Sequence, residues 1–151
     1  MSAASDPTED AAIPMAKRVL VVEDHPATRT LIRTILEADK AETYEVVEAA
    51  TGTECLKAAD SKGPFDLVLL DVNLPDMDGF AVCRAIRHVE TRVPIVFVTA
   101  KGDLRDYAAG REAGGDSYLV KPISRAALRS IVTLFTTVER KGAAADQQEI
   151  A

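Results

Sequence analysis

Four apolar runs in this chain each end at a polar residue. The runs cover residues 19–22, 67–70, 95–98 and, more weakly, 118–120, and the polar residues that follow them are Glu23 and Asp24, Asp71, Thr99 and Lys121. Short apolar runs separated by helical patterns are typical of buried parallel strands. The carboxyl ends of such strands share one edge of an open sheet, where ligands bind. The sequence therefore predicts one site that gathers three carboxylates, a hydroxyl and a lysine.

Strand and helix patterns alternate five times from Arg18 onward. We expect strands over residues 18–22, 44–48, 66–70, 93–98 and 117–120, and helices over residues 26–39, 52–61, 79–89, 103–113 and from Ser124 to about 141. Pro26 suits the first turn of a helix because its missing N–H would have no partner there. Five such units with short connections predict an α/β fold, a doubly wound parallel sheet with helices on both faces.

The two ends of the chain lack this periodicity. We expect residues 1–16 to be a disordered leader, with Met15 as an alternative translation start, residues 17–141 to form the single domain, and residues 142–151 to be a disordered polar tail. Too few residues follow the last helix for a DNA-binding or catalytic domain. We therefore expect the output to lie on the surface of this one domain.

Composition excludes several other classes of protein. A formal net charge of −6 argues against a nucleic-acid surface, which needs a basic patch. No apolar stretch approaches the roughly 20 residues that span a bilayer, and no signal peptide is apparent. Cys55 and Cys83 fall in helical patterns without a CxxC pair, so we expect reduced, buried thiols. These features together predict a cytoplasmic protein without membrane insertion.

An ordered set of motifs resembles the receiver domain of two-component response regulators. The set comprises Glu23-Asp24, the segment DVNLPDMDG from Asp71 to Gly79, Thr99-Ala100, and Lys121-Pro122, with Tyr118 three positions before the lysine. Each motif alone is weak, but the ordered set over about residues 17–141 is highly specific. The resemblance implies the CheY-like, flavodoxin-like (βα)5 fold with strand order 2-1-3-4-5. Together with the few residues that follow the last helix, it predicts a stand-alone response regulator without a DNA-binding output domain.

By this resemblance, Asp71 is the phosphoacceptor and receives a phosphoryl group from a histidine kinase or a phosphotransfer protein. Its carboxylate is ionised at neutral pH and needs no general base, but the repulsion between two anions must be neutralised. Mg²⁺ prefers oxygen ligands and keeps several waters, so a few carboxylates suffice to hold it. The resemblance implies that Asp24 and Asp71 bind Mg²⁺ directly, that Glu23 acts largely through water, and that the Asn73 carbonyl adds a ligand.

The resemblance also implies a switch. Lys121 pairs with Asp71 or with a phosphoryl oxygen, and the Thr99 hydroxyl donates to another phosphoryl oxygen. Thr99 then moves and Tyr118 rotates inward from a solvent-facing rotamer. A downstream protein, or a second copy of the chain, would recognise the face formed by the fourth helix, fifth strand and fifth helix. Candidate contacts on the fourth helix are Leu104, Tyr107 and Arg111.

Other functions fit the motifs less well. Phosphohydrolases of the haloacid dehalogenase type also use magnesium and an aspartyl phosphate, but they place a second Asp where this chain has Asn73. We therefore expect no enzyme, only slow self-catalysed phosphotransfer and dephosphorylation. A binding module that never uses phosphate would not need the complete set. Within signalling, a motility-type effector, a relay intermediate and a phosphate sink stay open. We assign no chemical role to His25, because Mg²⁺ prefers oxygen and the donor histidine belongs to the kinase.

Overall fold

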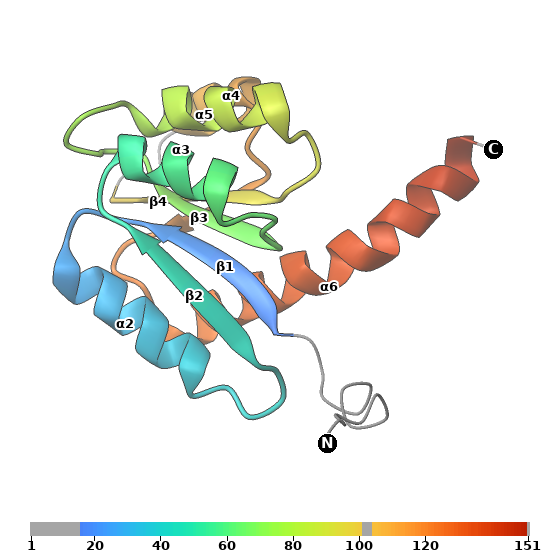
Figure 1. Cartoon of the computed structure of the whole chain (residues 1–151), viewed down its shortest axis with the longest axis horizontal. Helices are drawn as coiled ribbons and strands as arrows, with labels where there is room; N and C mark the ends of the chain where they lie inside the picture. The colour runs from blue at the N-terminus through green and yellow to red at the C-terminus, as the bar shows by residue number, and fades with distance from the viewer. Residues whose placement is uncertain (1–15, 101–103, 151) are drawn as a thin grey trace, which may run out of the picture.

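Five parallel strands form one sheet in the computed structural model, which describes residues 16–100 and 104–150. The strands are β1 (Lys17–Val22), β2 (Tyr44–Ala49), β3 (Leu67–Asp71), β4 (Ile95–Thr99) and β5 (Ser117–Val120). They lie in the order β2-β1-β3-β4-β5 (Figure 1). The predicted α/β class and the strand order that the resemblance implied are both confirmed.

Helices cover both faces of this sheet. They are α2 (Pro26–Glu37), α3 (Gly52–Ser61), α4 (Gly79–Val89), α5 (Leu104–Ala113) and α6 (Arg125–Ile150). Helices α3, α4 and α5 lie on one face, and α2 and α6 lie on the other (Figure 1). Pro26 occupies the start of α2, as its missing N–H predicts.

Two hydrophobic cores, one on each face, account for the uninterrupted apolar runs. Val19 and Val21 of β1 belong to the core under α2 and α6, whereas Leu20 and Val22 belong to the core under α3, α4 and α5. Successive residues of a strand point to opposite faces, so a strand that is covered on both sides needs apolar residues at every position. The two cysteines are free and buried in the second core, and burial raises the pKa of Cys55 to about 12.

Helix α6 corrects the prediction for the C-terminal end of the chain. We expected the helix to end near residue 141 and residues 142–151 to be disordered, but α6 continues to Ile150 and extends away from the sheet (Figure 1). The single Gly142 costs about 1 kcal/mol in a helix, and the alanine, glutamine and glutamate residues that follow it are strong helix formers. The leader expected over residues 1–16 lies outside the described residues except for Ala16, as do Lys101 and Asp103.

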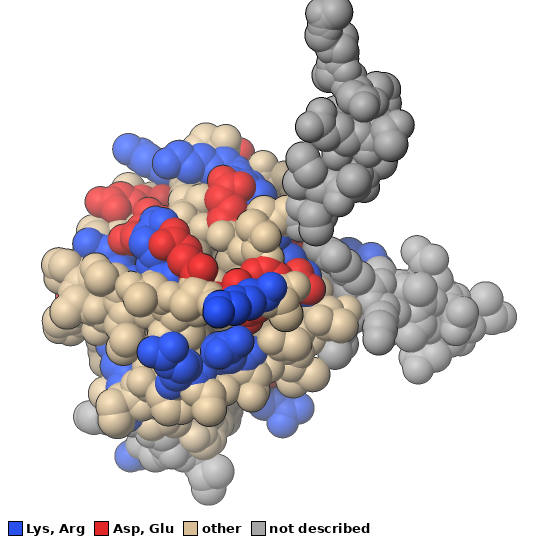
Figure 2. All heavy atoms as spheres, turned by 90° about the horizontal axis from the view of Figure 1, so that it is seen from below, with Lys and Arg blue, Asp and Glu red and all other residues tan. Residues whose placement is uncertain are grey.

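The surface carries charges of both signs. Figure 2 shows basic and acidic side chains on the same face of the molecule. On α2, Arg33 forms ion pairs with Glu37 at 2.9 Å and with Glu48 of β2 at 2.6 Å. Among residues 16–100 and 104–150, no helix combines the length and the apolar character that crossing a bilayer requires.

Leu128 is one of the residues that hold α6 on the sheet, because Leu128 and Val132 are both fully buried in the core under α2 and α6. We expect Leu128→Ala to lower the free energy of unfolding by about 2–5 kcal/mol, since it leaves a cavity in a packed core. Leu134→Ala, on the same helix but half-exposed, should change it by less than about 0.5 kcal/mol. Urea denaturation of both variants measures this difference, and equal effects would contradict the packing described.

Candidate functional site

The register of the sheet brings the predicted polar residues to one edge. Val22 lies opposite Leu70, Asp71 lies opposite Val98, and Thr99 lies opposite Val120. The residues at or just after these positions are therefore neighbours at the carboxyl ends of β1, β3, β4 and β5. They are Glu23, Asp24, Asp71, Thr99 and Lys121.

The three carboxylates form one compact cluster. Carboxylate oxygens of Glu23, Asp24 and Asp71 and a ring nitrogen of His25 all lie within 4.8 Å of one another. Glu23 is 1% exposed and Asp71 is 3% exposed. Like charges held this close in a partly dehydrated pocket repel one another strongly, so the cluster requires positive charge.

Lys121 supplies part of that charge. Its Nζ lies 2.9 Å from Glu23 Oε1 and donates a hydrogen bond to Asp71 Oδ2 at 3.2 Å. The Lys121–Pro122 peptide bond is cis. Burial works to lower the pKa of Lys121, but the hydrogen bond to Glu23 and the charge of Asp71 outweigh it and hold the pKa above its usual value. One ammonium group is thus shared between two carboxylates.

The two buried carboxylates differ in how easily they ionise. Desolvation, together with the nearby charge of Glu23, raises the pKa of Asp71 to about 6. Desolvation also works to raise the pKa of Glu23, but hydrogen bonds from Lys121 and His25 hold it below the usual value. Of these two carboxylates, Glu23 therefore ionises more easily, and the charge of Asp71 depends more on nearby cations.

His25 is the residue at this edge that sequence reasoning set aside. Its Nδ1 lies 2.9 Å from Glu23 Oε2 and 3.2 Å from Asp24 Oδ1. The hydrogen bond with Glu23 and the charge of Asp24 raise the pKa of His25. Its position directly after Glu23 and Asp24 was the sequence feature that could have indicated a role. In the structure, its exposed ring contacts both carboxylates.

The residues present fit a magnesium ion. Asp24 Oδ1 is buried, and although the exposed His25 ring lies 3.2 Å away, this oxygen accepts no hydrogen bond from any residue that the structure describes. Such an atom is costly to bury unless a cation or a donor occupies the space beside it. The oxygen atoms available as metal ligands belong to carboxylates, which suit Mg²⁺. The negative charge of the three carboxylates exceeds the single positive charge of Lys121.

The loop after β3 closes tightly against Asp71. Asn73 N donates to Asp71 Oδ1 at 2.9 Å, and Gly79 N donates to the Val72 carbonyl at 2.8 Å. A Cβ atom at Gly79 would overlap the Asp71 backbone carbonyl, so only glycine allows α4 to begin there. The loop therefore places the backbone of Asn73 next to the cluster.

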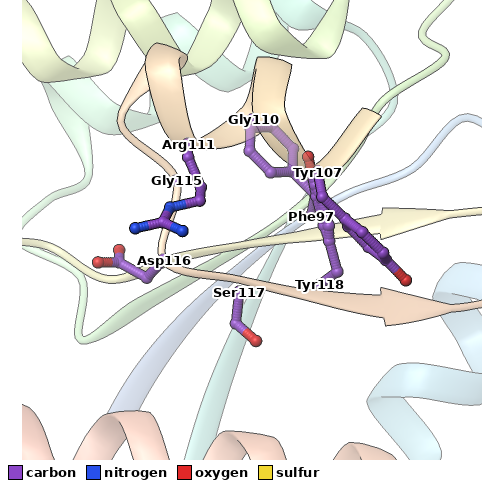
Figure 3. Close-up of a pocket in the computed structure, with 8 residues that line it drawn as sticks. All are labelled: Phe97, Tyr107, Gly110, Arg111, Gly115, Asp116, Ser117 and Tyr118. Carbon is purple, nitrogen blue, oxygen red and sulfur yellow. The ribbon is translucent and has the colours of Figure 1, made fainter. Parts of the chain in front are cut away.

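Tyr118 lies inward in this structure. Its ring meets Phe97 edge-to-face at 5.4 Å and lies 4.5 Å from the Tyr107 ring, measured between centroids, and its hydroxyl donates to the Asp106 carbonyl. These rings form one end of a cavity of about 310 Å³ between α5 and β5, and Arg111 and Asp116 form the other end (Figure 3).

Two of the three contact residues expected on the fourth helix, which is α5, line this cavity. Tyr107 and Arg111 both line it, Tyr107 half-buried and Arg111 exposed. Leu104 begins α5, and its side chain lies outside the described part of the chain. Thr99 is buried at the end of β4 and its carbonyl accepts a hydrogen bond from Lys121 N at 2.8 Å.

A five-stranded sheet that presents a carboxylate cluster and a lysine at its carboxyl edge is the arrangement of a receiver domain. The sequence model of the response regulator receiver domain matches residues 19–133. The chain belongs to this family, whose members act in two-component signal transduction.

Curated relatives include two regulators from Bacillus subtilis. The chain is 41% identical over 110 residues to the alkaline phosphatase synthesis transcriptional regulatory protein PhoP, covering 73% of this chain and 44% of PhoP. It is 42% identical over 107 residues to the transcriptional regulatory protein ResD, covering 71% of this chain and 42% of ResD. The chain thus spans less than half the length of these relatives, and the expectation of a stand-alone receiver stays a prediction.

Solved structures show the same fold. A CheY-like response regulator receiver domain protein from Methanospirillum hungatei is 29% identical, with a TM-score of 0.78, over 85% of this chain and 99% of that one. The receiver domain of a sensor histidine kinase from Pseudomonas aeruginosa is 33% identical, with a TM-score of 0.73, over 82% of this chain and 99% of that one. That structure has a magnesium ion coordinated in its active-site cleft.

The raised pKa of Asp71 predicts a pH-dependent cost in stability. Because this pKa is about 6 rather than 3.8, the folded chain holds the proton more tightly than the unfolded chain does. Ionisation therefore destabilises the fold as pH rises between these values. In magnesium-free buffer, we expect Asp71→Asn to become more stable than the parent through this window, by about 3 kcal/mol at pH 7. Urea denaturation from pH 4 to 7 measures it, and a stability difference that does not change with pH would contradict the assignment.

Proposed function

We propose that this chain is a phosphoacceptor that receives a phosphoryl group on Asp71 from the phosphohistidine of a kinase or phosphotransfer protein, with Mg²⁺ bound beside it. The observation that carries the proposal is the buried cluster of Glu23, Asp24 and Asp71 with Lys121 as its shared counter-charge. In the transfer, the P–N bond to the donor histidine breaks and a P–O bond to an Asp71 carboxylate oxygen forms. The imidazole nitrogen of the donor leaves with the electron pair of the broken bond.

Glu23, Asp24, Asp71 and the Asn73 carbonyl would hold the metal ion. Mg²⁺ there supplies positive charge that neutralises the carboxylates and the phosphoryl oxygens. Asp71 is the carboxylate best suited to react, because its pKa is raised and a nearby cation would keep it ionised at neutral pH. Its attack needs no general base, since an ionised carboxylate carries no proton to remove.

Lys121 and Thr99 would bind the transferred group. The Lys121 ammonium already bridges Glu23 and Asp71 and has three donors, so it can pair with a phosphoryl oxygen without leaving the cluster. Thr99 lies at the end of the neighbouring strand, one residue beyond the position opposite Asp71, from which its hydroxyl can donate to a second oxygen. We assign no further enzymatic activity to the chain, and its self-catalysed phosphotransfer and dephosphorylation are slow.

The output would pass through α5, β5 and α6. Phosphorylation adds negative charge and acceptor oxygens beside Thr99. Tyr118 packs between Phe97 and Tyr107, so a shift at the end of β4 alters what α5 and β5 present to a protein partner or to a second copy. The relatives are named as transcriptional regulators; for this chain we propose protein–protein contact as the immediate output.

Asp71→Asn tests the acceptor. We expect incubation with acetyl phosphate and Mg²⁺ to add one phosphoryl group to the parent chain and none to this variant, because an amide cannot form the acyl phosphate. Asp60→Asn, which changes an exposed aspartate on α3, should be labelled as the parent is. Intact-mass spectrometry measures the added phosphate, and an undiminished mass increase on Asp71→Asn would show that the acceptor lies elsewhere.

The absence of a side chain at Gly110 leaves room for the inward Tyr118 ring. A Cβ atom at Gly110 would overlap the Tyr118 hydroxyl, and a ring that can rotate yields more easily than backbone. Since burial raises the pKa of the Tyr118 phenol, we expect Gly110→Ala to move the ring outward and lower this pKa toward that of an exposed phenol carrying the same label. Fluorotyrosine NMR titration measures this, with the Tyr118 signal assigned from Tyr118→Phe. Glu112→Ala on the same helix should leave the titration unchanged.

A further inference from the structure

The loop between β3 and α4 is tied to the start of α3 by one side chain, Asp76. Asp76 Oδ1 accepts a hydrogen bond from Gly52 N at 2.7 Å. Asp76 Oδ2 accepts two more, from Thr53 N at 3.0 Å and from Thr53 Oγ1 at 2.7 Å. The first N–H groups of a helix have no partner within the helix, and the positive helix end favours a carboxylate. Asp76 satisfies two of these N–H groups from a different element.

Helix α3 has a cap of its own, so it does not need Asp76 in order to begin. The Thr51 side chain accepts a hydrogen bond from Glu54 N at 3.0 Å, and Glu54 Oε1 accepts one from Ala50 N at 2.8 Å. Thr51 is thus a local N-cap, and Glu54 adds a hydrogen bond to the residue before it. The three contacts of Asp76 are therefore best understood as a link between the loop and the helix.

The other end of the same loop lies in the acidic site. Asn73 N donates to Asp71 Oδ1, and Asn73 forms an isolated antiparallel bridge with Asp78. The loop over residues 73–78 is thus closed at its base beside Asp71 and held at its tip by Asp76. It also packs closely on α3, because a Cβ atom at Gly52 would lie 2.8 Å from Met77 Sδ.

We propose that Asp76 is a positioning residue for the metal site. By holding the loop tip on α3, it fixes the backbone of Asn73, whose carbonyl the proposed function assigns to Mg²⁺. This inference rests on that proposed function and deepens it. Without the link, the loop samples more conformations, and metal binding has to order it at a cost in affinity. Hydrogen bonds from Thr53 and Gly52 hold the pKa of Asp76 below its usual value, so the link is intact at neutral pH.

Calorimetric titration with MgCl₂ alone, on the parent chain and on Asp76→Ala, tests the inference. We expect the Kd for Mg²⁺ to rise about 10-fold in Asp76→Ala, the lower end of the effect of residues that orient metal ligands. Amide hydrogen exchange in magnesium-free buffer gives a second readout that does not depend on the metal. Exchange at Gly52, Thr53 and Asn73 should become faster in Asp76→Ala.

Glu54→Gln is the matched control. It removes one negative charge at the same helix end and weakens the local cap, but it leaves the link to the loop intact. We expect it to lower the melting temperature while keeping the Kd within about twofold. Asp76→Asn retains one acceptor oxygen and should fall between Asp76→Ala and the parent.

Two results would overturn the inference while leaving the proposed function in place. Both apply to a parent chain that binds Mg²⁺ and accepts phosphate on Asp71. One is an Asp76→Ala variant that binds Mg²⁺ as tightly as this parent does. The other is a Glu54→Gln variant that loses as much affinity as Asp76→Ala, because the effect would then belong to charge or helix stability. A parent chain that neither binds Mg²⁺ nor accepts phosphate would overturn the proposed function and this inference together.

Discussion

The repulsion among three neighbouring carboxylates is the interaction around which this molecule is organised. Glu23, Asp24 and Asp71 lie within one small cluster, and Lys121 pairs with two of them. Bringing charges this close out of water costs several kcal/mol per ion, and the two apolar cores of the sheet offset that cost. In the proposed function, this excess negative charge would attract a metal ion, and its neutralisation would make Asp71 a suitable acceptor.

Two sets of contacts connect the cluster to the rest of the fold. One runs through the loop after β3, where Asn73 contacts Asp71 and Asp76 contacts the start of α3. The other runs along the ends of β4 and β5, from Thr99 to the aromatic group around Tyr118. The first set holds the atoms that would bind a metal ion. The second set lies next to the face of α5 and β5 that a partner would contact after phosphorylation of Asp71.

Much of the fold and of the site could be predicted from sequence, because both follow from where apolar runs end. Residues 19–22 and 67–70 predict buried strands, and parallel pairing then brings Glu23 and Asp71 together. The strand order came only from family resemblance, since no local pattern specifies it. Asp76 and Gly110 were missed because their roles depend on contacts with Thr53 and Tyr118 that the sequence does not reveal. The length of α6 was wrong because Gly142 was given too much weight as a helix breaker.

The two cores of the sheet have different compositions, and this difference has a consequence for how the chain tolerates change. The loop residues Val72, Leu74 and Met77, and the aromatic residues Phe97 and Tyr118, all belong to the core under α3, α4 and α5. The core under α2 and α6 contains none of them. The sheet thus separates the core under α2 and α6 from the core that packs against the loop after β3 and the aromatic group around Tyr118. Substitutions in the core under α3, α4 and α5 therefore have to preserve the contacts of this loop and of these aromatic rings as well as the stability of the fold.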